Sequence, residues 1–250
     1  MTQRIFAANW KMHLGPQGTR AFMDTFLDMY APQDEREVWF FPSAVALGTA
    51  VAAVQGTTGI VVGAQNVHWE AQGAFTGELS IPMAREAGAT AALVGHSERR
   101  HVFGETDEET GSKVRALLDA GLTPMLCVGE KIEQREAGET LAVVERQLSV
   151  LGQYDRQALG RVVIAYEPVW AIGTGKTATP TDAAEVHAFI RQWLTKHGAD
   201  RKTIRVLYGG SVKPVNIRSL MAEPEIDGVL VGGASLEPES WTAIAQTPLD

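Results

Sequence analysis

The sequence predicts an α/β protein built as a single (β/α)8 barrel, and three observations indicate this fold. Short apolar runs recur about every 30 residues along a chain of 250 residues. Each run is almost continuously apolar, which is typical of parallel strands buried on both faces. Segments with the periodicity of amphipathic helices separate the runs. Eight such units fit one domain over residues 1–250. The expected strands are 5–8, 38–41, 60–62, 91–94, 125–128, 162–165, 204–207 and 229–231.

Two of the intervening helices have clear start signals. Thr106 and Glu109 have the spacing of a capping box, and an apolar stripe follows them until Gly121. Thr179 precedes Pro180, which is favoured at the first position of a helix. The residues behind Pro180 again carry apolar side chains at spacings of three and four. We therefore expect helices that begin near residues 107 and 180.

A doubly wound sheet is the competing α/β fold. It would place a glycine-rich dinucleotide turn after the first strand. Residues 9–12 read Asn-Trp-Lys-Met there and contain no G-x-G-x-x-G pattern. The first turn therefore favours the barrel.

Composition excludes several classes of protein. The formal net charge of -8 argues against nucleic acid as a partner, and it means that an anionic substrate needs locally placed donors. The single cysteine, Cys127, lies within an apolar run and is expected to be a small buried thiol. Because no apolar stretch is long enough to cross a membrane, we expect a cytoplasmic protein without a membrane partner.

The sixth strand ends in a carboxylate followed by an unusual loop. Glu167 comes directly after the apolar run, and Pro168 fixes the backbone behind it. Trp170 and Ile172 are apolar where an ordinary turn is polar, and small residues follow up to residue 178. This composition suits a lid over a site, with a base at its root.

Other strand ends supply possible partners for that base. Since the carboxyl ends of all barrel strands face one site, residues placed there are functional candidates. The first strand delivers Asn9 and Lys11, spaced so that both project the same way. The fourth delivers His96, and the charged residues 98–100 behind it suggest a supporting ion network.

Two glycine pairs, 209–210 and 232–233, follow the seventh and eighth strands. Glycine lets backbone N–H groups approach a ligand closely, and a short helix starting there would direct its positive end at an anion. The two pairs together predict a phosphate site.

Residues 173–177 end like a nucleotide-binding loop, but Trp170 stands where that pattern needs glycine. The histidines show no metal-binding spacing, so no metal is expected. Two alternatives to the lid stay open: a nucleotide-binding module that uses residues 173–177, and a phosphate-binding barrel with a larger substrate.

Five motifs resemble the triosephosphate isomerase family, in the family's order and over almost the whole chain. They are 9–11 (Asn-Trp-Lys), 95–100 (Gly-His-Ser-Glu-Arg-Arg), 165–175 (Ala-Tyr-Glu-Pro-Val-Trp-Ala-Ile-Gly-Thr-Gly), 208–211 (Tyr-Gly-Gly-Ser) and 231–234 (Val-Gly-Gly-Ala). The resemblance implies a TIM barrel that interconverts dihydroxyacetone phosphate and D-glyceraldehyde 3-phosphate through an enediol(ate), in glycolysis and gluconeogenesis, without a cofactor.

The resemblance also implies a role for individual residues. Glu167 is the expected base, and Lys11 and a neutral His96 are the expected donors to the substrate oxygen. The expected substrate-binding residues are Asn9, Lys11, Gly173, Ser211, Gly232 and Gly233.

A further segment, Gln65 to Glu78, resembles the family's dimer loop. It is long for a strand-to-helix connection and contains Trp69 and Phe75, which suggests that it does not stay solvated. The resemblance implies a homodimer in which Thr76 lies near the neighbouring subunit's Lys11 and His96.

Overall fold

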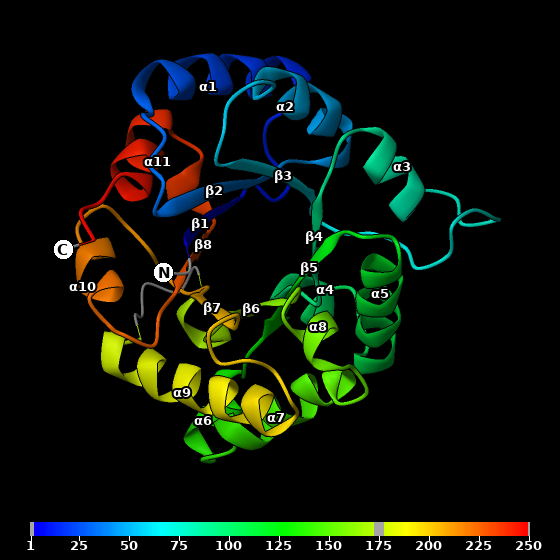
Figure 1. Ribbon diagram of the computed structural model, residues 1–250, viewed down its shortest axis with the longest axis vertical. Helices are drawn as coiled ribbons and strands as arrows, with labels where there is room; N and C mark the ends of the chain where they lie inside the picture. Colours follow the sequence, from blue (N-terminus) through cyan, green and yellow to red (C-terminus); the bar gives the residue numbers. More distant parts are fainter. Residues whose placement is uncertain (1–2, 173–177, 250) are drawn as a thin grey trace.

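The computed structural model describes residues 3–172 and 178–249, and within them eight parallel strands close into a barrel (Figure 1). Each strand pairs with its neighbours in chain order, and the first pairs with the last. The strands are β1 (Arg4–Asn9), β2 (Arg36–Phe41), β3 (Ile60–Ala64), β4 (Ala91–Val94), β5 (Thr123–Val128), β6 (Val163–Tyr166), β7 (Arg205–Tyr208) and β8 (Gly228–Val231).

The predicted barrel is therefore confirmed, and every predicted strand overlaps an observed one. The boundaries differ by one or two residues where pairing decides them. β1 reaches Asn9 because Asn9 still pairs with Phe41 of β2. β6 begins only at Val163, because the N–H of Val162 donates to the carbonyl of Leu159 in the preceding turn.

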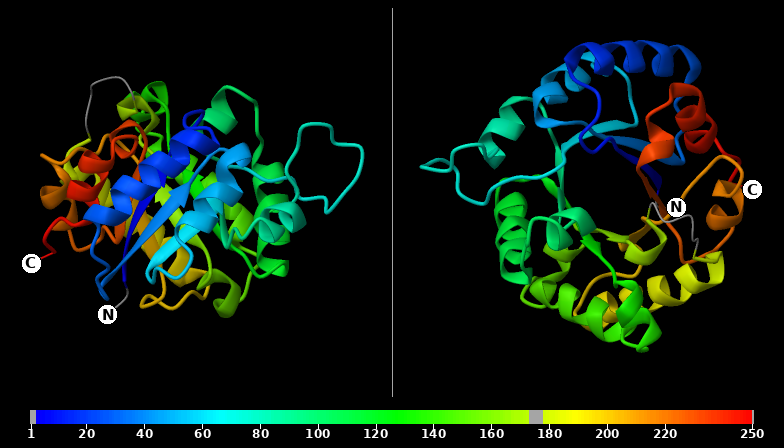
Figure 2. Two further views of the ribbon diagram at one scale, coloured as in Figure 1. Left: turned by 90° about the horizontal axis from the view of Figure 1, so that it is seen from above. Right: turned by 180° about the vertical axis from the view of Figure 1, so that it is seen from behind.

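The helices form a ring outside the strands (Figures 1 and 2). They are α1 (Pro16–Met29), α2 (Leu47–Ala53), α3 (Ile81–Glu86), α4 (Ser97–His101), α5 (Asp107–Asp119), α6 (Ile132–Glu136), α7 (Thr140–Leu148), α8 (Arg156–Leu159), α9 (Pro180–Lys196), α10 (Ile217–Met221) and α11 (Pro238–Ala245). In the part of the chain that the structure describes, four 3-10 turns supplement them: η1 (Ala44–Ala46), η2 (Ser149–Leu151), η3 (Val169–Ala171) and η4 (Gly233–Ser235). No helix in residues 3–172 and 178–249 is long and apolar enough to cross a membrane.

Both predicted helix starts are confirmed. At α5, Thr106 and Glu109 form the reciprocal capping box. At α9, Thr179 forms the same arrangement with Asp182, and Pro180 is the first helical residue. These caps satisfy backbone N–H groups that a helix start otherwise leaves without partners.

The core has two layers. One cluster lies between the strands and the helices, and a second fills the barrel interior. Cys127 belongs to the interior cluster and is fully buried, and burial raises the pKa of its thiol well above the usual value. The expectation of a small buried thiol is thus confirmed.

His187 on α9 is a buried imidazole in contact with β6. Its ring lies edge-on to Tyr166 at 5.9 Å between centroids, and its Nδ1 is 3.1 Å from the carbonyl oxygen of Glu225. Burial lowers the pKa of His187 to about 3. The folded protein therefore keeps this ring neutral in mildly acidic solution, whereas the unfolded chain protonates it.

We predict that the free energy of unfolding falls as the pH drops below about 6.5, by about 1.4 kcal/mol per pH unit from this group. The loss should continue until the pH reaches the folded pKa of about 3. Urea unfolding at pH 7.5 and at pH 5, at the same protein concentration, measures this loss of free energy of unfolding. H187Q should reduce this slope, whereas H13Q, which changes an exposed histidine, should not. An unchanged slope in H187Q would contradict the assignment.

Candidate active site

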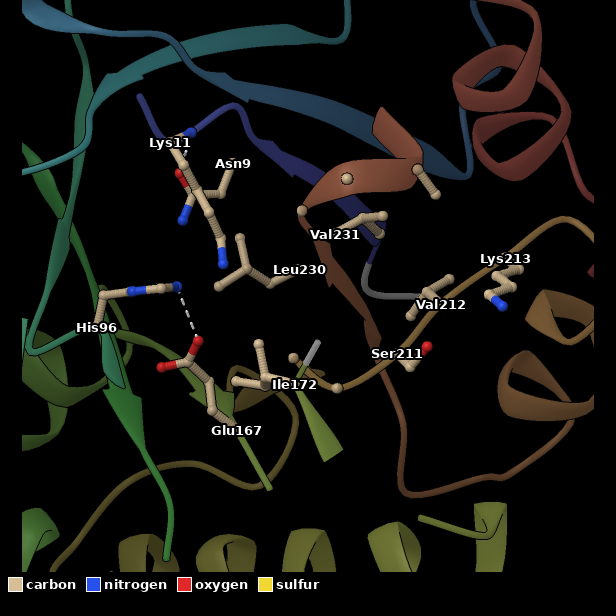
Figure 3. A pocket seen from close by; sticks show the side chains of 15 residues that line it. Asn9, Lys11, His96, Glu167, Ile172, Ser211, Val212, Lys213, Leu230 and Val231 are labelled. Atoms are coloured by element: carbon tan, nitrogen blue, oxygen red, sulfur yellow. Dashed lines mark hydrogen bonds and ion pairs between the residues drawn. The ribbon is translucent and has the colours of Figure 1, made fainter. Parts of the chain in front are cut away.

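The carboxyl ends of the strands surround a cavity of about 290 Å³ (Figure 3). Residues that follow β1, β4, β6, β7 and β8 line it, as expected for a barrel. Of the described residues predicted for the site, the structure brings together Asn9, Lys11, His96, Glu167, Ser211, Gly232 and Gly233. The predicted residue Gly173 lies outside the described residues.

Glu167 occupies the first position after β6, and its side chain is buried. Its Oε1 lies 3.0 Å from Nε2 of His96, and its Oε2 accepts a hydrogen bond of 2.8 Å from the N–H of Ser97 (Figure 3). Burial raises the pKa of this carboxyl, but His96 and the N–H of Ser97 lower it more, so the net direction is downward. The carboxylate is therefore ionised at neutral pH, as a base must be.

His96 caps the N-terminus of α4 with its own ring. Its Nδ1 accepts a hydrogen bond from the N–H of Glu98 at 3.3 Å. A ring that accepts at Nδ1 carries its proton on Nε2, the nitrogen that faces Glu167. Burial lowers the pKa of His96, but the carboxylate of Glu167 outweighs burial and makes the net pKa higher than usual. Glu167 thus favours protonation of the ring while the two side chains remain paired.

Lys11 follows β1 in a left-handed conformation, with φ of 50°. Such a backbone is unfavourable for a residue with a side chain and needs support. The side-chain oxygen of Asn9 accepts a 3.0 Å hydrogen bond from the N–H of Lys11. The side-chain amide of Gln65 donates to the backbone carbonyl of Lys11 at 2.8 Å. The ammonium group then reaches Glu98 at 2.6 Å. Asn9 therefore fixes the turn from which Lys11 enters the cavity.

The ion network expected around residues 98–100 is present. Glu98 pairs with Lys11, while Arg99 contacts Glu105 at 3.1 Å. Arg100 contacts Asp107 at 2.7 Å and also donates to the carbonyl of Gly95. These contacts hold the segment that carries His96 and Ser97.

The two glycine pairs have different structural roles. Gly233 begins η4, so a short helical turn starts at the cavity as predicted. At Gly232, an added Cβ would lie 3.3 Å from Cε of Lys11. In the other pair, the N–H of Gly209 already donates to the carbonyl of Tyr166, so it is not free for a ligand. An added Cβ there would lie 2.9 Å from Cγ of Glu167. Gly209 thus makes room for the carboxylate.

Glu130 is a fully buried carboxylate beneath the loop after β6, and the sequence motifs do not predict it. It accepts hydrogen bonds from Nε1 of Trp170 at 2.8 Å and from the hydroxyl of Tyr166 at 3.1 Å. The guanidinium of Arg135 lies 4.6 Å from the ring centroid of Trp170. The sequence does contain one indication of a role for Glu130, because this residue comes soon after the end of β5, as Glu167 comes after the end of β6.

The loop from Gln65 to Glu78 stands away from the barrel ahead of α3 (Figure 2). Phe75 is 43% exposed at this loop. Trp69 is only partly exposed, and it stacks on His68 at 4.2 Å between ring centroids.

A closed barrel with a carboxylate, an imidazole and a lysine around one small cavity defines a class: barrel enzymes that move protons on small ligands. Comparison with known proteins is more specific. The sequence profile of the triosephosphate isomerase family matches residues 4–248. Triosephosphate isomerase from Aquifex aeolicus is 48% identical, over 97% of this chain and 98% of that protein. The protein of that name from Roseiflexus sp. is 50% identical, over 98% and 97% of the two chains.

The chain belongs to the triosephosphate isomerase family. It is therefore an isomerase whose reaction interconverts dihydroxyacetone phosphate and D-glyceraldehyde 3-phosphate, a step of glycolysis.

We predict that G209A lowers kcat by about tenfold to a hundredfold, because the new methyl group displaces the side chain of Glu167. Steady-state kinetics with either triose phosphate measures the effect. G48A is the matched control, since a Cβ at position 48 meets no atom within 4 Å. Equal kcat values for the two variants would show that Gly209 does not set the position of Glu167.

Proposed function

We propose that Glu167 is the base of the isomerisation and that the reaction runs through an enediol(ate). The observation that carries this proposal is the buried Glu167 carboxylate, 3.0 Å from Nε2 of His96 in the cavity that Lys11 also lines. A proton next to a carbonyl group is weakly acidic, so a base must be held against the carbon that carries it. A positioned base contributes about 10²–10⁴-fold to the rate, or about 3–5 kcal/mol.

His96 and Lys11 stabilise the negative charge that develops on the substrate oxygen. In the structure, Nε2 of His96 faces Glu167 and the ammonium of Lys11 faces Glu98. When substrate enters, its oxygen takes the place of the carboxylate at Nε2, and His96 donates as the neutral ring. A donor of this kind contributes about 3–4 kcal/mol. The exchange frees Glu167 to take the proton from carbon.

Binding of the phosphate group supplies energy without taking part in the chemistry. Backbone N–H groups of Ser211, Gly232, Gly233 and Gly173 hold it, and Asn9 fixes Lys11 beside it. This remote binding energy closes the loop 168–178 over Glu167 and excludes water from the intermediate. The hydrogen bond from Trp170 to Glu130 holds the root of that loop. A closing movement that includes Trp170 would break the hydrogen bond between Trp170 and Glu130.

The protein acts in the cytoplasm as a homodimer joined through the loop Gln65 to Glu78. Exposed apolar side chains support this arrangement: Phe75 (43% exposed) and Phe103 (67%) line one hollow beside the loop, and Met12 is 95% exposed. Neighbouring exposed apolar groups of this kind are typical of an interaction surface. Thr76 then lies near the neighbouring subunit's Lys11 and His96, so each site depends on the partner.

The proposed base is tested by E167Q, which we expect to lower kcat by about 10²–10⁴-fold. Binding of phosphoglycolate should change little, because the phosphate contacts remain. A coupled assay with each triose phosphate measures turnover, and E185Q on the exposed face of α9 is the control. Activity within tenfold of wild type would show that Glu167 is not the base.

The proposed dimer predicts that F75E dissociates the protein and reduces its activity, because burial of an unpaired carboxylate is unfavourable. Sedimentation over a dilution series measures the association. L141E introduces the same charge at an exposed leucine of α7 and should stay dimeric. A fully active monomer would refute the role given to this loop.

A further inference from the structure

The geometry points to Lys213 as an additional substrate-capture residue of this cavity, one that attracts the phosphate group of the incoming substrate. The ligand, a triose phosphate, follows from the family's reaction, and the inference rests on the proposed function for the place where its phosphate group binds. It adds a side-chain cation to a phosphate site that is otherwise assigned to backbone N–H groups and Lys11.

Lys213 lies at the glycine-lined end of the cavity. It follows β7 by a few residues and lines the cavity together with Ser211 and Gly232. Figure 3 shows it beside Val212, at the end of the cavity away from His96. Its location is therefore suited to the non-reacting phosphate and not to the carbonyl group.

The backbone of Lys213 is held in a fixed relation to Ser211 by one side chain. The side-chain oxygen of Asn216 accepts the N–H of Lys213 at 2.7 Å, and its amide group donates to the carbonyl of Ser211 at 3.0 Å. The N–H of Asn216 also donates to the carbonyl of Lys213 at 3.1 Å. Asn216 thus orders the turn, while Lys213 remains exposed.

The charges around the cavity leave Lys213 as an available cation. The chain has a net charge of -8, so its overall field repels a phosphate dianion. Lys11 is engaged with Glu98 at 2.6 Å. Among the described lining residues, the other charged side chains are those of Glu167 and Lys213. Within the described chain Lys213 makes no ion pair, so its positive charge is not neutralised by a neighbour.

An exposed charge near a binding site acts mainly on the encounter between the partners. It raises the association rate of an oppositely charged ligand, and dissolved salt screens the effect. We therefore assign Lys213 to substrate capture, which affects kcat/KM, and not to the chemical step, which affects kcat.

K213Q tests this assignment, with K196Q on the exposed end of α9 as the matched control. At an ionic strength of about 0.01 M, K213Q should lower kcat/KM for glyceraldehyde 3-phosphate about threefold and leave kcat unchanged. The difference from wild type should vanish at about 0.3 M salt, where screening is strong. K213R keeps the charge and should restore the wild-type value.

Two results would overturn the inference. One is a K213Q enzyme that matches K196Q in kcat/KM at every ionic strength. The other is a loss that appears in kcat, persists at high salt and is not restored by K213R, which would indicate a structural role. Failure of Glu167 as the base would appear separately, as an active E167Q enzyme, and would leave this salt-dependent comparison intact.

Discussion

The interaction on which the site depends is the contact between the buried carboxylate of Glu167 and its donors. Burial alone would raise the pKa of this group and disfavour its charged form. His96 and the N–H of Ser97 oppose burial and keep the carboxylate ionised. The buried carboxylate therefore stays charged although burial disfavours charge, because these donors offset the cost.

The barrel makes this contact possible through the order of its strands. Glu167 follows β6, whereas His96 and Ser97 follow β4, with β5 between them. The N–H of Glu167 donates to the carbonyl of Val128 at the end of β5 at 2.7 Å, which fixes the backbone of the base. Gly209, after β7, leaves the room that the side chain occupies. Three strand ends thus support one carboxylate from different sides.

Much of this arrangement could be predicted from the sequence, because it depends on local patterns. Apolar runs predict the strands, the capping boxes predict the starts of α5 and α9, and the strand ends predict the residues at the cavity. The fold then brings Lys11, His96 and Glu167 together.

Other features could not be predicted because they depend on contacts between distant segments. The left-handed backbone of Lys11 requires support from Gln65, which lies 54 positions away. Glu130 is important only because Trp170 and Tyr166 converge on it. The glycine at 209 was interpreted as a ligand contact, although its N–H is engaged and its role is to make room for Glu167.

The central claim is that the donors around Glu167, and not its exposure to water, keep it ionised. Proton uptake on binding of phosphoglycolate at pH 7.5 tests this claim most directly. If the ligand takes the donors and the closed loop excludes water, burial prevails and the pKa of Glu167 rises. The account predicts that the wild-type protein takes up protons on binding and that E167Q does not. Binding without proton uptake, or with equal uptake by E167Q, would contradict it.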